Sequence, residues 1–354
     1  MGACEKIWEQ IKKKIMKNDR QPSHQDLKAL YSAAIEFKKT TPWDWMHDSD
    51  LFGVQDPVSG ETGYCCIMGA AGEHFALGVY LGGEGLAGIL RILSGEFSDQ
   101  PGEALFVQKC LMASFEDRTY LKKEDLQQIK ALGLKFRGAN AYPLFRNYAP
   151  GFVPWYLTGE EARFLTLALQ QAIEVSRRFE KDPDMLINSS SGKIFVRTPV
   201  KQGDSILWKD EWKDPLIHEI EDVLPVDKTL LNRLKKANLQ RRGIWEVDFF
   251  HVPAPVWESG KRPYYPYMSL MVEHHSGMLL NFQLDQKEDF TLTFMEKFIS
   301  FLERLKIAPQ GFLVKRNEVY LSLEPLAAKS GIGIKLVESL PILEEAQRNM
   351  RNFI

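Results

Sequence analysis

The sequence predicts two domains, an α+β domain followed by an α/β domain with a mixed sheet and flanking helices. The chain has 354 residues, more than the roughly 100 to 200 residues of an average domain. Hydrophobic residues make up 44% of it and charged residues 26%, which is ordinary globular composition. Its apolar residues recur with helical spacing in some stretches and with strand spacing in others, so both kinds of element are expected.

The first elements are helices. Apolar side chains within residues 8–16 alternate with lysines at helical spacing, which predicts a short basic amphipathic helix in a segment of its own, 1–22. Ser23 and Asp26 then form an N-cap signature for a second helix, which should end at Thr41.

The next part of the chain alternates strands and helices. Gly- and Pro-containing turn sequences join the first three strands, so we expect these strands to be antiparallel. The predicted strands are 51–54, 64–68, 75–81 and 111–115, and the predicted helices are 84–93 and 122–132.

The first domain is expected to end with a loop, a long helix and two strands. The stretch 136–156 contains too many prolines for a helix interior, so we expect an irregular loop there. A capping box at 158–161 opens the long helix. Strands are predicted at 185–188 and 193–198, and the first domain is placed at 23–225.

A polar, charged connector is expected at 226–243, and the second domain at 244–354. The predicted order of elements in that domain is three strands, helix, strand, helix, strand, helix. The strands are 245–252, 267–273, 278–284, 312–315 and 333–337, and the helices are 291–305, 321–329 and a last one from 342.

That order, with Asp248 on the first strand, resembles the core of the ribonuclease H-like superfamily, which includes retroviral-type integrases and transposases. The resemblance implies a metal-binding carboxylate on the first strand, a second at the end of the fourth strand and another on a helix. The helix candidates are Glu296 and either Glu344 or Glu345, but Lys315 stands at the end of the fourth strand, and an ammonium group cannot bind Mg²⁺. The resemblance therefore implies a ribonuclease H-like fold without the full set of catalytic acids.

The chain as a whole resembles a family of uncharacterised bacterial proteins. That resemblance implies a bacterial-type cytosolic protein and supplies no catalytic residue. It is carried by residues 42–43, 50–54, 63–65, 82–85 and 150–155.

Histidines give a second set of metal-binding candidates. Asp248, His251 and His275 lie on or beside strands that should be neighbours, and imidazole with carboxylate suits zinc, iron or nickel. The stretch 273–277 is also typical of a solvated hairpin turn. Both interpretations stay open, and the sequence itself calls for no cofactor.

Arg137, Tyr142 and Arg146 are candidate binding residues in a stretch where arginines and aromatic residues interleave. Such residues can stack bases or clamp an anion. Prolines and aromatic residues that pin an irregular connection to the domain would give the same pattern.

Charge and composition limit the kinds of partner that the chain could bind. Lys plus Arg (45) nearly balance Asp plus Glu (47), for a formal net charge of −2, so nucleic acid or an anionic ligand would need a local patch. No apolar run reaches the roughly 18 residues of a membrane span. Lysines replace the apolar core of a signal peptide at the start of the chain, so we expect a cytoplasmic protein.

The leading hypothesis is a non-catalytic cytosolic binding or regulatory protein whose partner is unknown. One alternative is a divalent-metal-dependent nuclease, which would require Asp248, Glu296 and Glu345 to converge. The other is a small-molecule binder through the Arg and aromatic loop of the first domain, which would require a pocket there.

Overall fold

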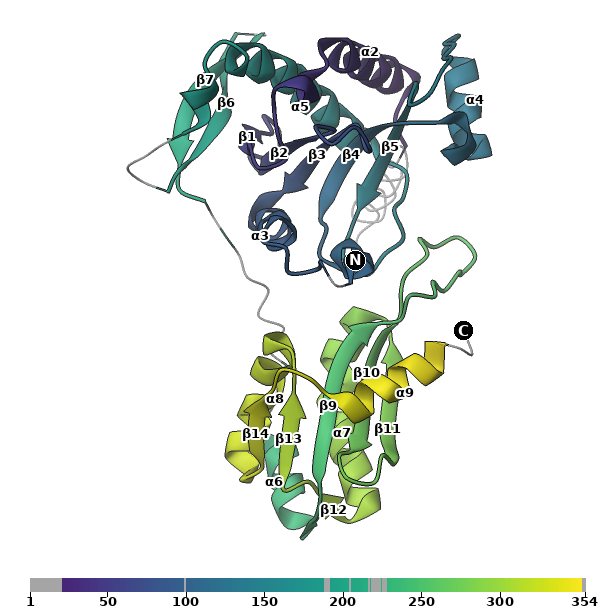
Figure 1. Ribbon diagram of the computed structural model, residues 1–354, viewed down its shortest axis with the longest axis vertical. Helices are drawn as coiled ribbons and strands as arrows, with labels where there is room; N and C mark the ends of the chain where they lie inside the picture. The colour runs from purple at the N-terminus through teal and green to yellow at the C-terminus, as the bar shows by residue number, and fades with distance from the viewer. Residues whose placement is uncertain are drawn as a thin grey trace, which may run out of the picture. The chain divides into compact units, whose positions relative to one another are not determined.

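The computed structural model describes residues 21–98, 100–187, 192–203, 205–215, 217, 224 and 228–351. The chain divides into two compact units (Figure 1). Unit 1 comprises Met1–Pro150 and Pro154–Glu219, and unit 2 comprises Gly151–Val153 and Ile220–Ile354. The amphipathic helix expected within 1–22 lies outside the described residues.

Unit 1 is built on a seven-stranded sheet in the order β5-β4-β3-β2-β1-β6-β7. Neighbouring strands are antiparallel except for β1 and β6, which are parallel. The antiparallel pairing expected for the first three strands is therefore confirmed. The strands are β1 (Phe52–Gln55), β2 (Thr62–Met68), β3 (Ala76–Leu81), β4 (Cys110–Glu116), β5 (Tyr142–Tyr148), β6 (Ile194–Gln202) and β7 (Ser205–Lys213).

Helices cover both faces of this sheet. α2 (His24–Thr40) and α5 (Gly159–Phe179) bury their apolar sides with Phe52, Cys65 and other residues of one face, whereas α3 (Gly82–Leu93) packs on the other face. Successive strand residues point to opposite faces, so Cys66, which follows Cys65, packs with the apolar residues of α3 on the other face. Both α2 and α5 begin with the capping boxes that the sequence predicts.

The shorter helices of unit 1 connect these elements. Along the chain, α4 follows β4 and precedes β5, and short 3₁₀ helices join other elements. Their bounds are α4 (Lys123–Ala131), η1 (Pro42–Asp44), η2 (Pro101–Phe106), η3 (Arg118–Tyr120) and η4 (Pro183–Leu186).

Two expectations for unit 1 are wrong. The stretch expected to be an irregular loop contains β5, at one edge of the described sheet, where Pro143 is tolerated. The strand expected at 185–188 is instead the 3₁₀ helix η4. The other edge strand, β7, was not predicted; most of its residues are exposed, and Trp208 packs against the core.

Unit 2 is built on a mixed five-stranded sheet in the order β11-β10-β9-β13-β14. β9, β10 and β11 are antiparallel, and β13 is parallel to both β9 and β14. Apart from the two-residue strand at Ile307–Ala308, the element order from β9 onward is the order that the sequence predicts. The bounds are β9 (Ile244–His251), β10 (Tyr267–Glu273), β11 (Leu279–Asp285), α7 (Lys287–Leu305), β13 (Gly311–Val314), α8 (Asn317–Ser330), β14 (Gly333–Leu336) and α9 (Pro341–Arg351).

The two faces of this sheet differ. Trp245, Val247 and Phe249 of β9 point into the main core with α7 and α8. Helix α6 (Lys228–Lys236) contributes Leu234 to the same core, and a short parallel pair joins β8 (Gln240–Arg241) to β12 (Ile307–Ala308). On the opposite face, Leu343 of α9 packs in a smaller apolar cluster with β10 residues. None of the described helices is long and apolar enough to cross a membrane.

Candidate functional site

Two acidic residues of β9 lie on the face of the unit 2 sheet that α9 covers. Strand alternation directs Glu246 and Asp248 to this face, because Trp245, Val247 and Phe249 point into the main core. Glu246 is 0% exposed and Asp248 is 5% exposed. Carboxylates buried to this extent need hydrogen bonds or opposite charges, so their partners define what they can do.

The Asp248 carboxylate is paired with a guanidinium group. Arg316 Nε lies 3.2 Å from Asp248 Oδ1. Gln347 Nε2 of α9 donates to Asp248 Oδ2 at 3.4 Å, and the Phe249 N–H donates to Oδ1 at 2.9 Å. Arg316 lies just after β13, which is hydrogen-bonded to β9. The parallel pairing of these strands therefore brings the cation to the carboxylate.

Glu246 and Glu344 each have partners of their own. Glu246 Oε1 lies 2.6 Å from His274 Nδ1, and the Leu343 N–H donates to Glu246 Oε2 at 2.8 Å. Lys315 Nζ donates to Glu344 Oε1 at 3.1 Å. Burial opposes ionisation of Glu344, but the hydrogen bonds from Lys315 and the Leu340 N–H lower its pKa below the ordinary value. Lys315 and Arg316, adjacent after β13, thus each neutralise one acid.

The three carboxylates proposed for metal binding do not converge. Glu296 belongs to α7, which packs on the face opposite Asp248. Its side chain is 71% exposed, with Oε1 3.9 Å from Arg233 Nη1. Glu345 is exposed on α9. Among the residues that the structure describes, no group of three or more His, Cys, Asp or Glu side chains could hold a metal ion.

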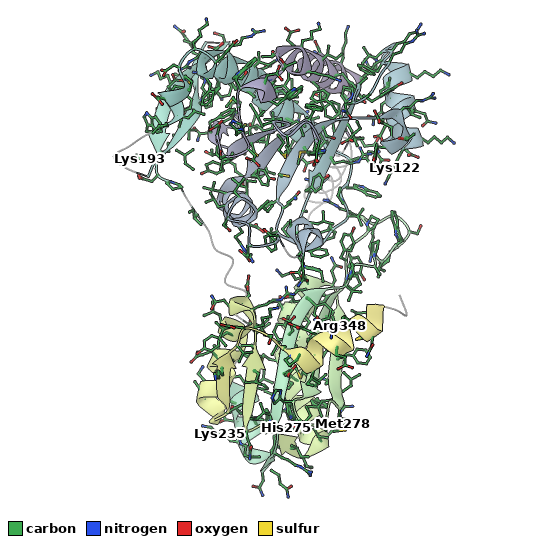
Figure 2. All side chains as sticks on the ribbon, in the orientation of Figure 1. Lys122, Lys193, Lys235, His275, Met278 and Arg348 are labelled. Carbon is green, nitrogen blue, oxygen red and sulfur yellow. The ribbon has the colours of Figure 1, made fainter. Side chains whose placement is uncertain are left out.

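Asp248, His251 and His275 are not brought together either. His251 Nδ1 lies 3.1 Å from the Tyr265 carbonyl oxygen, and its ring packs against Tyr267. His275 is exposed in the β10–β11 turn, close to Met278 (Figure 2).

Glu273 holds that turn. It accepts the Ser276 N–H at 2.7 Å, the Ser276 hydroxyl and the His275 N–H. These bonds, the one from the Ser276 N–H foremost, lower the pKa of Glu273 to about 2. The histidine-rich stretch is therefore a hairpin turn held by an ionised glutamate.

In unit 1, the three candidate binding residues lie in different surroundings. Arg146 of β5 is buried, and its two terminal nitrogens donate to Asp125 at 2.9 and 2.7 Å. The Tyr142 hydroxyl donates to the Phe136 carbonyl at 2.9 Å, whereas Arg137 is exposed. The Arg146 guanidinium is therefore occupied by the protein itself and cannot clamp an external anion.

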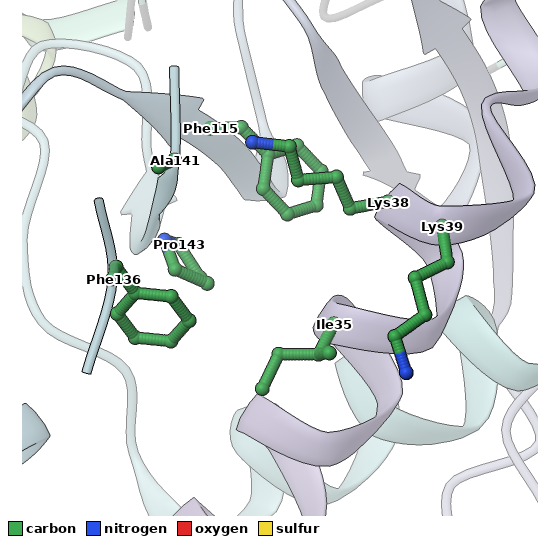
Figure 3. Close-up of a pocket in the computed structure, with 7 residues that line it drawn as sticks. All are labelled: Ile35, Lys38, Lys39, Phe115, Phe136, Ala141 and Pro143. Atoms are coloured by element: carbon green, nitrogen blue, oxygen red, sulfur yellow. The ribbon is translucent and has the colours of Figure 1, made fainter. Parts of the chain in front are cut away.

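The same stretch nevertheless forms one wall of a cavity of about 280 Å³ (Figure 3). Ile35 and Lys39 of α2 face Phe136 and Pro143 across it. The lining residues are Ile35, Lys38, Lys39, Phe115, Phe136, Ala141 and Pro143. Arg137, Tyr142 and Arg146 do not line this cavity, and no local sequence pattern indicated that α2 would close it.

Lys38 is the more buried of the two lysines that line this cavity. Its ammonium lies 5.3 Å from the centroid of the Phe115 ring and donates to the Asn140 carbonyl oxygen. Burial lowers the pKa of Lys38 from its ordinary value. Asn140 has a left-handed backbone with φ of 51°, and its N–H donates to Asp117 Oδ1 at 2.8 Å. The loop is thus fixed so that its carbonyl faces the ammonium.

Comparison with known proteins gives a family match in each unit. No curated protein matches the chain. Residues 28–197 match the family model described as Domain of unknown function (DUF7309), and residues 230–351 match Domain of unknown function (DUF6930). The first stretch falls in unit 1 except for Gly151–Val153, and the second falls in unit 2. The chain is therefore similar to two domains of unknown function, one over most of unit 1 and one in unit 2.

Proposed function

We propose that this chain is a non-catalytic binding or regulatory protein whose unit 2 is a ribonuclease H-like domain without metal chemistry. The pairing of Asp248 with Arg316 carries the proposal. The order of elements from β9 to α9 and the mixed sheet support the resemblance in fold. A cytoplasmic protein is part of the same proposal, and the free, buried thiols of Cys65, Cys66 and Cys110 support it, because disulfides are rare in the cytosol. The bacterial type rests on the resemblance of the whole chain alone.

The physical reason is electrostatic. In the ribonuclease H-like proteins that unit 2 resembles, the carboxylate on the first strand binds a divalent cation. Asp248 occupies that position. Its oxygen instead faces a guanidinium, which stays protonated at every physiological pH. At about 4 Å and an effective dielectric constant of about 20, two like unit charges repel by about 4 kcal/mol, and Mg²⁺ carries two charges. A metal ion would have to displace Arg316 before it could bind.

The nuclease alternative requires carboxylates that share one site. Glu296 lies on the other face of the sheet. Lys315 donates a hydrogen bond to Glu344, and the adjacent Arg316 pairs with Asp248. This arrangement supports a domain that retains the fold and uses its former metal face for packing α9.

Incubation with single-stranded DNA, duplex DNA and an RNA–DNA hybrid, each with Mg²⁺ or Mn²⁺, tests the proposal. We expect no cleavage above a metal-free control. Asp248→Asn serves as the matched control for contaminating nucleases. Metal-dependent cleavage by the wild-type protein that disappears in Asp248→Asn would contradict the proposal and favour the nuclease.

A second candidate function, which can coexist with the first, is small-molecule binding by unit 1. The observation that favours it is the cavity formed by α2, Phe115 and the stretch around Pro143. Its lining replaces the proposed Arg137, Tyr142 and Arg146 with Lys38 and apolar side chains.

A further inference from the structure

We infer that the cavity of unit 1 binds a small organic anion, namely a carboxylate attached to an apolar or aromatic body. The inference rests on the proposed binding function and names its ligand class. It is carried by three features of the described residues: the size of the cavity, its apolar walls and the half-buried ammonium of Lys38.

The size of the cavity limits the ligand. Its volume of about 280 Å³ lies just below the roughly 300 to 1,000 Å³ typical of ligand sites. A single ring with a short chain matches a space of this size.

The walls of the cavity favour an apolar body. Ile35 comes from α2, Phe115 from β4 and Pro143 from β5, whereas Phe136 and Ala141 precede β5. Phe115 and Pro143 are paired in register on neighbouring strands, so this wall is fixed by the sheet. Burial of a ring against such surfaces is favourable in proportion to the apolar area removed from water.

Lys38 favours a negative charge on the ligand. An ammonium has three N–H donors, and the contact described for Lys38 uses one of them, on the Asn140 carbonyl. The group is held over Phe115 at the cavity and is partly desolvated. A carboxylate at this position would supply acceptors for the remaining donors and form a charge-assisted hydrogen bond.

The surrounding charges fit the same ligand. Lys39 also lines the cavity, and the lining contains no Asp or Glu. The C-terminal end of α2, where the helix dipole disfavours anions, and the Asp117 carboxylate on the Asn140 N–H oppose an anion, and Lys38 and Lys39 in the last turn of α2 offset them. Lys39 is exposed, with Nζ 3.5 Å from Glu36, so Lys38 is the more buried of the two cations.

The test uses 3-phenylpropionate and its uncharged counterpart 3-phenyl-1-propanol, titrated into the full chain and followed by protein NMR chemical shifts. We expect the carboxylate to bind about tenfold more tightly than the alcohol, the equivalent of one charge-assisted hydrogen bond. Lys38→Met keeps an apolar stem without the charge and should abolish this difference. Lys38→Arg should retain it.

Lys28→Met is the matched control, because Lys28 is exposed on the same helix and does not line the cavity. It should bind both probes like the wild-type protein. Ala141→Phe should fill the cavity and weaken binding of both.

Equal affinities for the acid and the alcohol in the wild-type protein, or binding of neither, would overturn the inference, as would unchanged selectivity in Lys38→Met. The comparison of probes on the wild-type protein decides the matter even if a variant fails to fold. Equal binding of both probes would leave small-molecule binding by unit 1 standing and overturn only the ligand class, whereas binding of neither would count against both, so the two failures are distinguishable.

Discussion

Replacement of Arg146 by alanine should destabilise unit 1 strongly. The guanidinium is buried, donates two hydrogen bonds to Asp125 and one to the Phe145 carbonyl, and lies 4.7 Å from the centroid of the Tyr156 ring. Its removal leaves the Asp125 carboxylate, 4% exposed, without its cation. Loss of one partner from a buried ion pair costs about 3 to 5 kcal/mol, far more than loss of a surface pair.

Urea denaturation, combined with hydrogen exchange of the β4–β5 amides to isolate unit 1, measures this loss. Arg137→Ala is the control, because Arg137 is exposed and its loss should change stability by less than about 0.5 kcal/mol. Asp125→Asn added to Arg146→Ala should recover part of the stability, since no unpaired buried charge remains. If Arg146→Ala stays within about 1 kcal/mol of the wild-type protein, the pair is not structural and the argument for its role fails.

Three further predictions follow from the described contacts. Phe145→Ala removes a ring packed against Tyr31 in the unit 1 core and should cost about 3 to 5 kcal/mol in thermal unfolding; a loss below about 1 kcal/mol would contradict the core assignment. Leu234→Ala should destabilise unit 2 by about 2 to 5 kcal/mol and expose α6 to protease, whereas unchanged proteolysis would make 228–236 a mere connector. The stability that ionised Glu273 contributes should be complete above the ordinary glutamate pKa near 4.5 and should disappear as the pH falls toward 2, and Glu273→Gln should remove this dependence; an unchanged acid profile in that variant would refute the role.

Unit 2 was the more predictable part of the fold. Its strands alternate or run apolar, and its helices carry apolar residues at regular spacing, so local pattern and tertiary role agree. The edge strands of unit 1 were missed for different reasons. β7 exposes most of its residues, although Trp208 packs against the core, and β5 contains Pro143, which argues against a strand except at an edge.

The candidate site was predictable only in part. The sequence placed Lys315 after the fourth strand of the second domain, and the structure has it there, bonded to Glu344. That Arg316 reaches Asp248 depends on the pairing of β9 with β13, two strands far apart along the chain, which no local pattern encodes. The cavity likewise joins Lys38 to the carbonyl of Asn140, a contact between segments 102 residues apart.

The stability of Asp248→Asn tests the central claim most directly. If Asp248 is one half of a structural ion pair, the neutral amide should lose the attraction of Arg316 and destabilise unit 2 by about 1 to 3 kcal/mol, and Mn²⁺ should not shift the melting temperature of the wild-type protein. A carboxylate kept for metal binding behaves in the opposite way, because it is repelled by neighbouring acids until the metal arrives. Equal or greater stability of Asp248→Asn, together with an Mn²⁺-dependent rise in the melting temperature of the wild-type protein alone, would contradict the account.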